Sequence, residues 1–165
     1  MKLLCFHVAG QDFALPIGSV KETLPERPLT RLFLVPPFVA GLINLRGEVV
    51  AVLDLAALLG LAGAKREARN IVVLRANLLP NARDPRNAAN RPAAGLLVDR
   101  LDGVHDLPPG ELQPPPPTLQ AEPAAYLEGV AQNSIDGGPP RPLLILAPER
   151  LLGAERLAPF RRETR

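Results

Sequence analysis

The sequence predicts an all-β protein, a barrel or a sandwich, made of about ten short strands joined by turns and short helical segments. Two observations support this fold class. Proline is unusually frequent, with 20 copies in 165 residues, and this content disfavours long helices and favours turns. Short runs of Val, Ile and Leu also alternate along the chain, at nearly regular intervals, with Gly, Pro, Asn and Asp.

The composition excludes several classes of protein. Hydrophobic residues make up 47% and charged residues 22%, as in a globular protein with a real core, and the length fits one domain. A net charge of +2 and 4% aromatic residues disfavour nucleic-acid binding. No apolar run approaches the roughly twenty residues of a membrane span, and the N-terminus lacks the pattern of a secretory signal. We therefore expect a cytoplasmic protein.

The first elements follow from turn residues and spacing. Residues 3–8 and 13–15 predict a hairpin, in which Gly10 and Asp12 supply the turn and Pro16 ends the second strand. Apolar residues in 17–24 recur at helical spacing, which predicts one short helix, or a single turn of helix, before Pro25.

The middle of the chain predicts further strands over 39–45, 48–55, 71–74, 95–98 and 100–107. Arg46 and Gly47 form the turn between the first two of these strands, and 56–61 is expected to be a helical turn. The segment 77–92 carries three prolines and four asparagines, and we expect it to be an exposed loop.

The last part of the chain begins with a proline-rich segment, 107–119. It predicts a stiff connector, with a polyproline ligand for a partner as the alternative. Residues 127–135 and 142–146 then predict the last strands, with a turn over 136–138. A faint internal repeat is visible as well: 40–44 resembles 128–132, and 52–55 resembles 144–147. This repeat indicates two related units.

Candidate catalytic and metal-binding groups are sparse. Cys5 and His7 would share one face of a strand, but no third orienting group is apparent, and a lone buried cysteine is usually a packing residue. The densest set of metal-ligating residue types falls around an expected turn, where aspartate is common for turn reasons, and has no known metal-ligand spacing: Asp99, Asp102, His105 and Asp106. We therefore predict no metal, no cofactor and no catalytic residue, and a protein that binds.

An arginine stands in the middle of the apolar run GLINLRGEVVAVLDL, at position 46. This block and four others, FHVAGQDFALPIGSVKET, NIVVL, AAGLLVDRLDGV and YLEGVAQ, occur in an order that resembles the CheW-type coupling proteins of bacterial chemotaxis. The resemblance runs from about residue 4 to about residue 152. It implies a single CheW-like domain over 1–165 with two SH3-like five-stranded β-barrels packed together, the first over about 17–98 and the second over 1–16 with 99–152.

The same resemblance implies the function and the partners. Members of this family are non-catalytic scaffolds that join the regulatory domain of a CheA-type histidine kinase to the cytoplasmic tips of chemoreceptors. We therefore expect recruitment of this protein to receptor arrays. The alternative is a regulatory or ligand-binding β-barrel of a divergent pathway, with the prolines 114–117 as a docking peptide. Binding to a kinase regulatory domain would discriminate between the two.

Three sets of residues are carried over from the family. Arg46 is expected to pair with Glu22 as a partly buried structural ion pair; alternatively Arg46 reaches solvent and its loss changes little. The receptor-binding set has a role in the core as its alternative, and the kinase-binding surface is assigned by analogy with the family. A receptor-binding groove is assigned to Val20, Ile71, Gly95 and Val104, and a kinase-binding surface to Leu42, Asn44, Gly47, Val50 and Val52.

The sequence departs from the family pattern at two places. Ala147 and Pro148 follow the last strand, where an acidic residue is common in the family. The loop 77–92 is longer than the tight hairpin usual there, by about ten residues.

Overall fold

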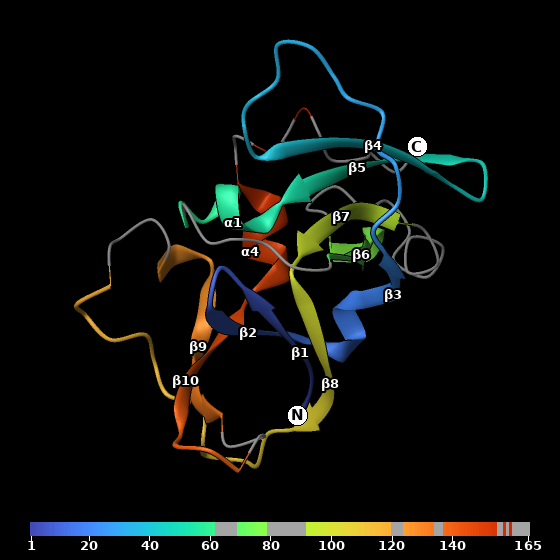
Figure 1. The fold of residues 1–165 in the computed structure, drawn as a ribbon. Helices are drawn as coiled ribbons and strands as arrows, with labels where there is room; N and C mark the ends of the chain where they lie inside the picture. Colours follow the sequence, from blue (N-terminus) through green and yellow to red (C-terminus); the bar gives the residue numbers. More distant parts are fainter. Residues whose placement is uncertain are drawn as a thin grey trace.

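The computed structural model describes residues 1–61, 69–78, 92–119, 124–133, 137–154, 157 and 159. These residues form two five-stranded sheets joined by short helical segments, so the protein is mostly β (Figure 1). None of the described helices is long and apolar enough to cross a membrane.

The first sheet has the order β8-β1-β2-β10-β9. In its hairpin β1–β2, Val8 pairs with Gln11, so the turn consists of Ala9 and Gly10. Both of these residues have positive φ. Asp12, expected in this turn, instead lies in the second strand, opposite His7. The five strands are β1 (Lys2–Val8), β2 (Gln11–Pro16), β8 (Arg100–Asp106), β9 (Leu127–Asn133) and β10 (Arg141–Leu146).

The second sheet has the order β3-β6-β7-β5-β4 and repeats the pairing pattern of the first. In each sheet one parallel pair, β2–β10 or β7–β5, stands among three antiparallel pairs. The hairpin β4–β5 thus corresponds to β9–β10, which is where the internal repeat lies. The strands are β3 (Val20–Pro25), β4 (Val39–Leu45), β5 (Glu48–Asp54), β6 (Asn70–Arg75) and β7 (Pro92–Val98).

Short helical segments follow several strands. They are η1 (Ile17–Ser19), α1 (Leu55–Leu58), η2 (Ala76–Leu78) and α4 (Pro148–Gly153). The helix expected over 17–24 was wrong beyond Ser19, since the chain continues as β3 and pairs with β6 from Val20 to Pro25. Two β-branched residues, Val20 and Thr23, suit this strand, and the pairing partner outweighs the weak helical spacing.

Three apolar clusters hold the sheets together. The largest joins the two sheets: Phe6 and Leu15 come from the first sheet, and Leu53, Val72 and Leu96 from the second. Each sheet packs a smaller cluster of its own, around Cys5 and Ile145 in the first and around Ile71 and Val52 in the second. The two sheets therefore share one apolar seam. The further division of the chain into two closed barrels stays a prediction.

The proline-rich segment is held at its middle and at its C-terminal end. Gln113 exchanges two backbone hydrogen bonds with Val130 of β9, at 2.9 and 2.8 Å, and Leu119 packs against the largest cluster. Gly129 makes room for the segment, because a Cβ there would lie 2.5 Å from Leu112 Cδ1. This geometry supports the connector, although Pro114, Pro116 and Pro117 remain exposed. The loop predicted over 77–92 lies mainly outside the described residues, and residues 134–136 lie wholly outside them.

Candidate functional site

The β4–β5 hairpin turns on two residues, Arg46 and Gly47. Both have positive φ, 51° and 85°, while Leu45 pairs with Glu48, as in a type I′ turn. The Asn44 side chain accepts a hydrogen bond from the Gly47 N–H at 2.9 Å. Asparagine and glycine are therefore needed for the turn itself, and the arginine is the residue that the turn presents.

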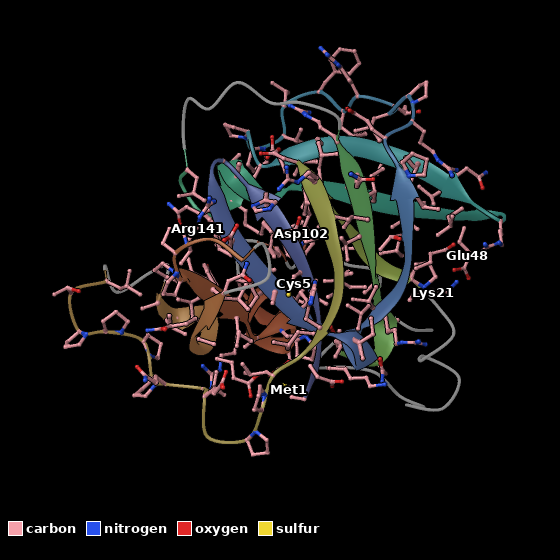
Figure 2. All side chains as sticks on the ribbon, turned by 60° about the horizontal axis from the view of Figure 1, so that its bottom comes forward. Met1, Cys5, Lys21, Glu48, Asp102 and Arg141 are labelled. Carbon is pink, nitrogen blue, oxygen red and sulfur yellow. The ribbon has the colours of Figure 1, made fainter. Side chains whose placement is uncertain are left out.

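The structure brings Arg46 and Glu22 together. Both guanidinium nitrogens of Arg46 donate to the Glu22 carboxylate, Nη1 to Oε1 at 2.7 Å and Nη2 to Oε2 at 3.0 Å. Lys21 Nζ donates to Oε1 of the same carboxylate at 3.3 Å. In Figure 2, Lys21 and Glu48 mark the side of the molecule where β3 approaches the tip of the hairpin.

The environment of this pair differs from the partly buried one that we expected. The Arg46 side chain is 69% exposed, whereas Glu22 is 19% exposed. Hydrogen bonding from Arg46 holds the pKa of the Glu22 carboxyl below its usual value of 4.5. Because water screens an exposed guanidinium, we expect the pair to fix geometry more than to add stability.

The residues assigned to the kinase-binding surface divide into two groups. Leu42, Asn44 and Gly47 lie at the surface of the hairpin or partly so, but Val50 and Val52 are buried in the core of the second sheet. Buried side chains cannot contact a partner, so these two valines are corrected to core residues. Val49, which the sequence analysis did not name, is 58% exposed on the same hairpin.

The receptor-binding set divides in the same way. Val20, Ile71 and Gly95 are buried, and a Cβ on Gly95 would lie 2.8 Å from Ile71 Cγ2. Their burial agrees with the core alternative, and their part in a receptor-binding groove stays a prediction. Val104 is the exception, since it is 52% exposed on β8, at the edge of the first sheet.

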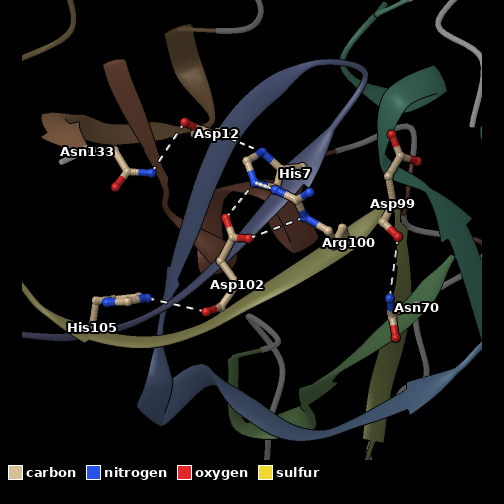
Figure 3. A network of polar contacts seen from close by, with 8 residues as sticks. All are labelled: His7, Asp12, Asn70, Asp99, Arg100, Asp102, His105 and Asn133. Carbon is tan, nitrogen blue, oxygen red and sulfur yellow. Dashed lines mark hydrogen bonds and ion pairs between the residues drawn. The ribbon is translucent and has the colours of Figure 1, made fainter. Parts of the chain in front are cut away.

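A polar cluster that the sequence analysis did not assemble lies at one end of the first sheet (Figure 3). His7 is its centre: Nδ1 contacts the Asp12 carboxylate, and Nε2 lies 2.6 Å from Asp102 Oδ2. Arg100 Nη2 is also 2.6 Å from His7 Nε2, and Asn133 donates to Asp12 Oδ2 at 3.3 Å. The cluster therefore ties together β1, β2, β8 and β9.

A β-bulge places Asp102 in this cluster. Cys5 pairs with Gly103 and Phe6 pairs with Leu101, so Asp102 is the extra residue on β8. Bulges of this kind redirect side chains. The other residues of the predicted aspartate and histidine set do not join it as ligands: the carboxylate of Asp99, for example, accepts from the Ala9 N–H at 2.8 Å.

The cluster is better suited to structure than to metal binding. His7, Asp12 and Asp102 lie close enough to share an ion. The two aspartates, however, face different nitrogens of one imidazole ring, and the lone pairs of these nitrogens point in different directions. An ion bound by one nitrogen would therefore lie on the side of only one aspartate. The Arg100 guanidinium already brings a positive charge to the Nε2 side. The imidazole ring contacts both carboxylates and so gives each of them a polar partner, as buried polar groups require.

Cys5, beside this cluster, is not set up as a nucleophile. The thiol is buried, and burial, with smaller contributions from the charges of Asp102 and Asp12, raises its pKa to about 11. The neutral thiol is therefore the dominant form near pH 7, which disfavours catalysis by the Cys5 and His7 pair. Figure 2 shows Cys5 and Asp102 on neighbouring strands.

Comparison with known proteins agrees with this architecture. The profile of the CheW-like domain family matches residues 2–156. The "Probable chemotaxis protein CheW" of Rhizobium etli is 31% identical over 115 residues, which cover 70% of this chain and 66% of that protein. "Protein FrzA" of Myxococcus xanthus is 33% identical over 134 residues, covering 81% of this chain and 75% of that protein.

A solved structure has the same fold. The crystal structure of the scaffolding protein TtCheW from Thermoanaerobacter tengcongensis superposes with a TM-score of 0.74 at 24% identity, covering 94% of this chain and 89% of that one. This structural similarity supports the fold. The family is supported separately by the profile match, which extends over nearly the whole of the sequence. The chain therefore belongs to the family of CheW-like domains.

Proposed function

We propose that this protein is a non-catalytic adaptor that couples the cytoplasmic tips of chemoreceptors to a CheA-type histidine kinase. The observation that carries the proposal is the family match over residues 2–156. The names of the relatives, chemotaxis protein CheW among them, support it. No comparable observation favours the alternative of a ligand-binding barrel that does not bridge receptor and kinase.

The β4–β5 hairpin is the proposed contact for the kinase regulatory domain. It offers Leu42, Asn44 and Gly47, as expected from the family, together with the exposed Val49. The type I′ turn and the Arg46–Glu22 pair hold this hairpin in one orientation relative to β3. A preorganised hairpin lowers the entropy cost of binding, which favours a rigid scaffold.

The proposed receptor contact is on the first sheet, around Val104 of β8. A half-exposed valine on an edge strand suits the apolar side of a receptor helix. Val20, Ile71 and Gly95 act from the core, by setting the packing of the second sheet. In this role the protein is held at receptor arrays through the receptor.

Titration calorimetry against the regulatory domain of a CheA-type kinase from the same genome tests the proposal. We expect micromolar binding by the wild type, and a loss of at least about tenfold for Val49→Asp, which places a charge in an apolar contact. Ile17→Ser is the matched control, since Ile17 is a partly exposed apolar residue away from the hairpin, on η1. No binding by the folded wild type would refute the adaptor proposal.

A further inference from the structure

The loop between β3 and β4 exposes three consecutive apolar side chains at its tip. Phe33 is 94% exposed, Leu34 is fully exposed and Leu32 is partly exposed. The loop arches away from both sheets at the top of Figure 1, next to β4. Single exposed apolar residues are ordinary, but a phenylalanine and a leucine together at a projecting tip indicate an interaction site.

The tip is held firmly at its base. Thr30 and Leu42 exchange two backbone hydrogen bonds, of 2.9 and 2.8 Å, which fix the ascending side of the loop to β4. Gly41 permits this approach, because a Cβ there would lie 2.7 Å from the Thr30 carbonyl oxygen. On the descending side Phe38 is buried, and its carbonyl accepts from the Asp54 N–H at 2.7 Å. The apolar tip is thus presented by a fixed frame.

Leu34 also has an unfavourable backbone conformation. Its φ of +56° is in the left-handed region, which suits glycine and asparagine better than leucine. An exposed leucine in this conformation contributes nothing to the core. Local strain of this kind, kept in place by well-ordered flanks, is typical of functional segments.

The base of the loop adds a small excess of positive charge to this apolar tip. Beside it lies a cavity of about 770 Å³, and its charged lining residues are three arginines and two carboxylates: Arg27, Arg31, Arg69, Glu26 and Asp54. Arg69 forms an ion pair with Glu26, in which Arg69 Nη1 lies 3.7 Å from Glu26 Oε1. Within the described part of the chain, no carboxylate pairs with Arg27 or Arg31. The surface around the tip therefore combines exposed apolar groups with two guanidinium groups that have no carboxylate partner among the described residues.

We propose that this loop extends the kinase contact: Phe33 and Leu34 enter an apolar pocket on the kinase regulatory domain, and carboxylates at the rim of that pocket pair with Arg27 and Arg31. The inference rests on the proposed function, because it takes its partner from there. The loop is continuous with that contact, since Thr30 is bonded to Leu42 of the hairpin. Apolar anchors surrounded by complementary charges are the usual arrangement of tightly bound interface centres.

The test compares two double variants with the wild type in calorimetric titrations of the same kinase domain. Phe33→Ser with Leu34→Asn removes the apolar tip, and it should melt at or above the wild-type temperature because asparagine tolerates a positive φ. We expect at least about tenfold weaker binding from a protein that is no less stable. Arg27→Glu with Arg31→Glu should weaken binding by about tenfold and flatten its salt dependence. Ile17→Ser should bind as the wild type does.

The outcomes separate this inference from the proposed function. If the wild type binds and the Phe33→Ser, Leu34→Asn variant binds equally well, the loop is no part of the contact and only this inference fails. If the wild type does not bind, the proposed function fails and this inference fails with it. If the wild type self-associates in sedimentation runs and the same variant abolishes this without weakening kinase binding, the occupant is a second copy, and the inference is overturned.

Discussion

Arg46 and Glu22 come from opposite edges of one five-stranded sheet, and their side chains still form two parallel hydrogen bonds. Neighbouring strands are about 4.8 Å apart, so the edges of a flat sheet of this width would be separated by about 19 Å, more than the two side chains can span. The sheet must therefore curl until the tip of the β4–β5 hairpin reaches β3. The pair links the two edges directly.

This pair predicts a dependence of stability on pH. Hydrogen bonding from Arg46 lowers the folded-state pKa of Glu22, so its contribution to stability is present above the usual value of 4.5 and is lost as the pH falls through the lower, folded-state pKa. Urea unfolding should show Glu22→Gln slightly less stable than the wild type at pH 7. The two proteins should converge in acid.

A double-mutant cycle provides the control for this prediction. Arg46→Ala should destabilise the wild type slightly and the Glu22→Gln protein less, because the charge-assisted part of the interaction is already gone. Equal effects of Arg46→Ala in both backgrounds would show that the two side chains do not interact in solution.

His7→Ala should be strongly destabilising. It removes the imidazole that lies between two carboxylates and leaves the buried Asp12 without it, a change that costs on the order of 3–5 kcal/mol of unfolding free energy. Chemical denaturation at fixed pH measures the loss. Arg100→Ala is the matched control, since its guanidinium is largely exposed, and its loss should stay within about 1 kcal/mol.

The double variant His7→Ala with Asp12→Ala sharpens this experiment. Removing the carboxylate together with the histidine abolishes the uncompensated buried charge. The double variant should therefore lose less unfolding free energy than the sum of the losses of the two single variants. If His7→Ala costs no more than Arg100→Ala, the cluster is not a structural tie between strands.

Much of the fold was predictable from the sequence because local patterns determine it. Proline and glycine mark the turns, the strands follow from apolar runs, and nine of the ten strands of the described chain fall where these patterns place them or nearby. The faint repeat between 40–55 and 128–147 corresponds to the hairpins β4–β5 and β9–β10, which hold the same position in the two sheets. Only β3 was expected as helix beyond Ser19, since spacing alone ignores the pairing partner.

The sites were less predictable because they depend on register and burial. His7 and Asp12 are close in sequence, but Asp102 reaches them only through a bulge in a strand about ninety residues away, and no local pattern indicates such a bulge. Assigning Ile71 and Gly95 to an open groove likewise required knowing which faces the sheets bury. The exposure of Phe33 and Leu34 could not be predicted either, since an apolar run in a sequence predicts burial.

Cys5 should resist alkylation while the protein is folded. With its pKa raised to about 11 by burial, the thiol is ionised in only about one molecule in a thousand at pH 8, and it is also shielded from reagent. Iodoacetamide labelling followed by mass spectrometry should show slow modification of the native protein and fast modification in guanidinium. Comparable rates in both states would mean that Cys5 is exposed in solution.

Gly95→Ala should destabilise the protein by about 1–3 kcal/mol through overpacking. The new Cβ would lie 2.8 Å from Ile71 Cγ2 and 3.4 Å from Val52 Cγ2, inside the core of the second sheet. Thermal unfolding measures the loss. Gly18→Ala is the matched control, because a Cβ at Gly18 would meet nothing within 4 Å and the residue has no positive φ.

The same variant decides whether Gly95 contacts the receptor or only shapes the core. A core role predicts that Ile71→Ala relieves part of the loss, since it frees the space that the added methyl group needs. It also predicts that Gly95→Ala, kept folded at low temperature, binds a receptor-tip fragment as the wild type does, whereas Val104→Asp on the exposed edge of β8 binds less well. A Gly95→Ala protein of unchanged stability that fails to bind would instead place Gly95 in the contact, and would mean that β7 opens toward the receptor in solution.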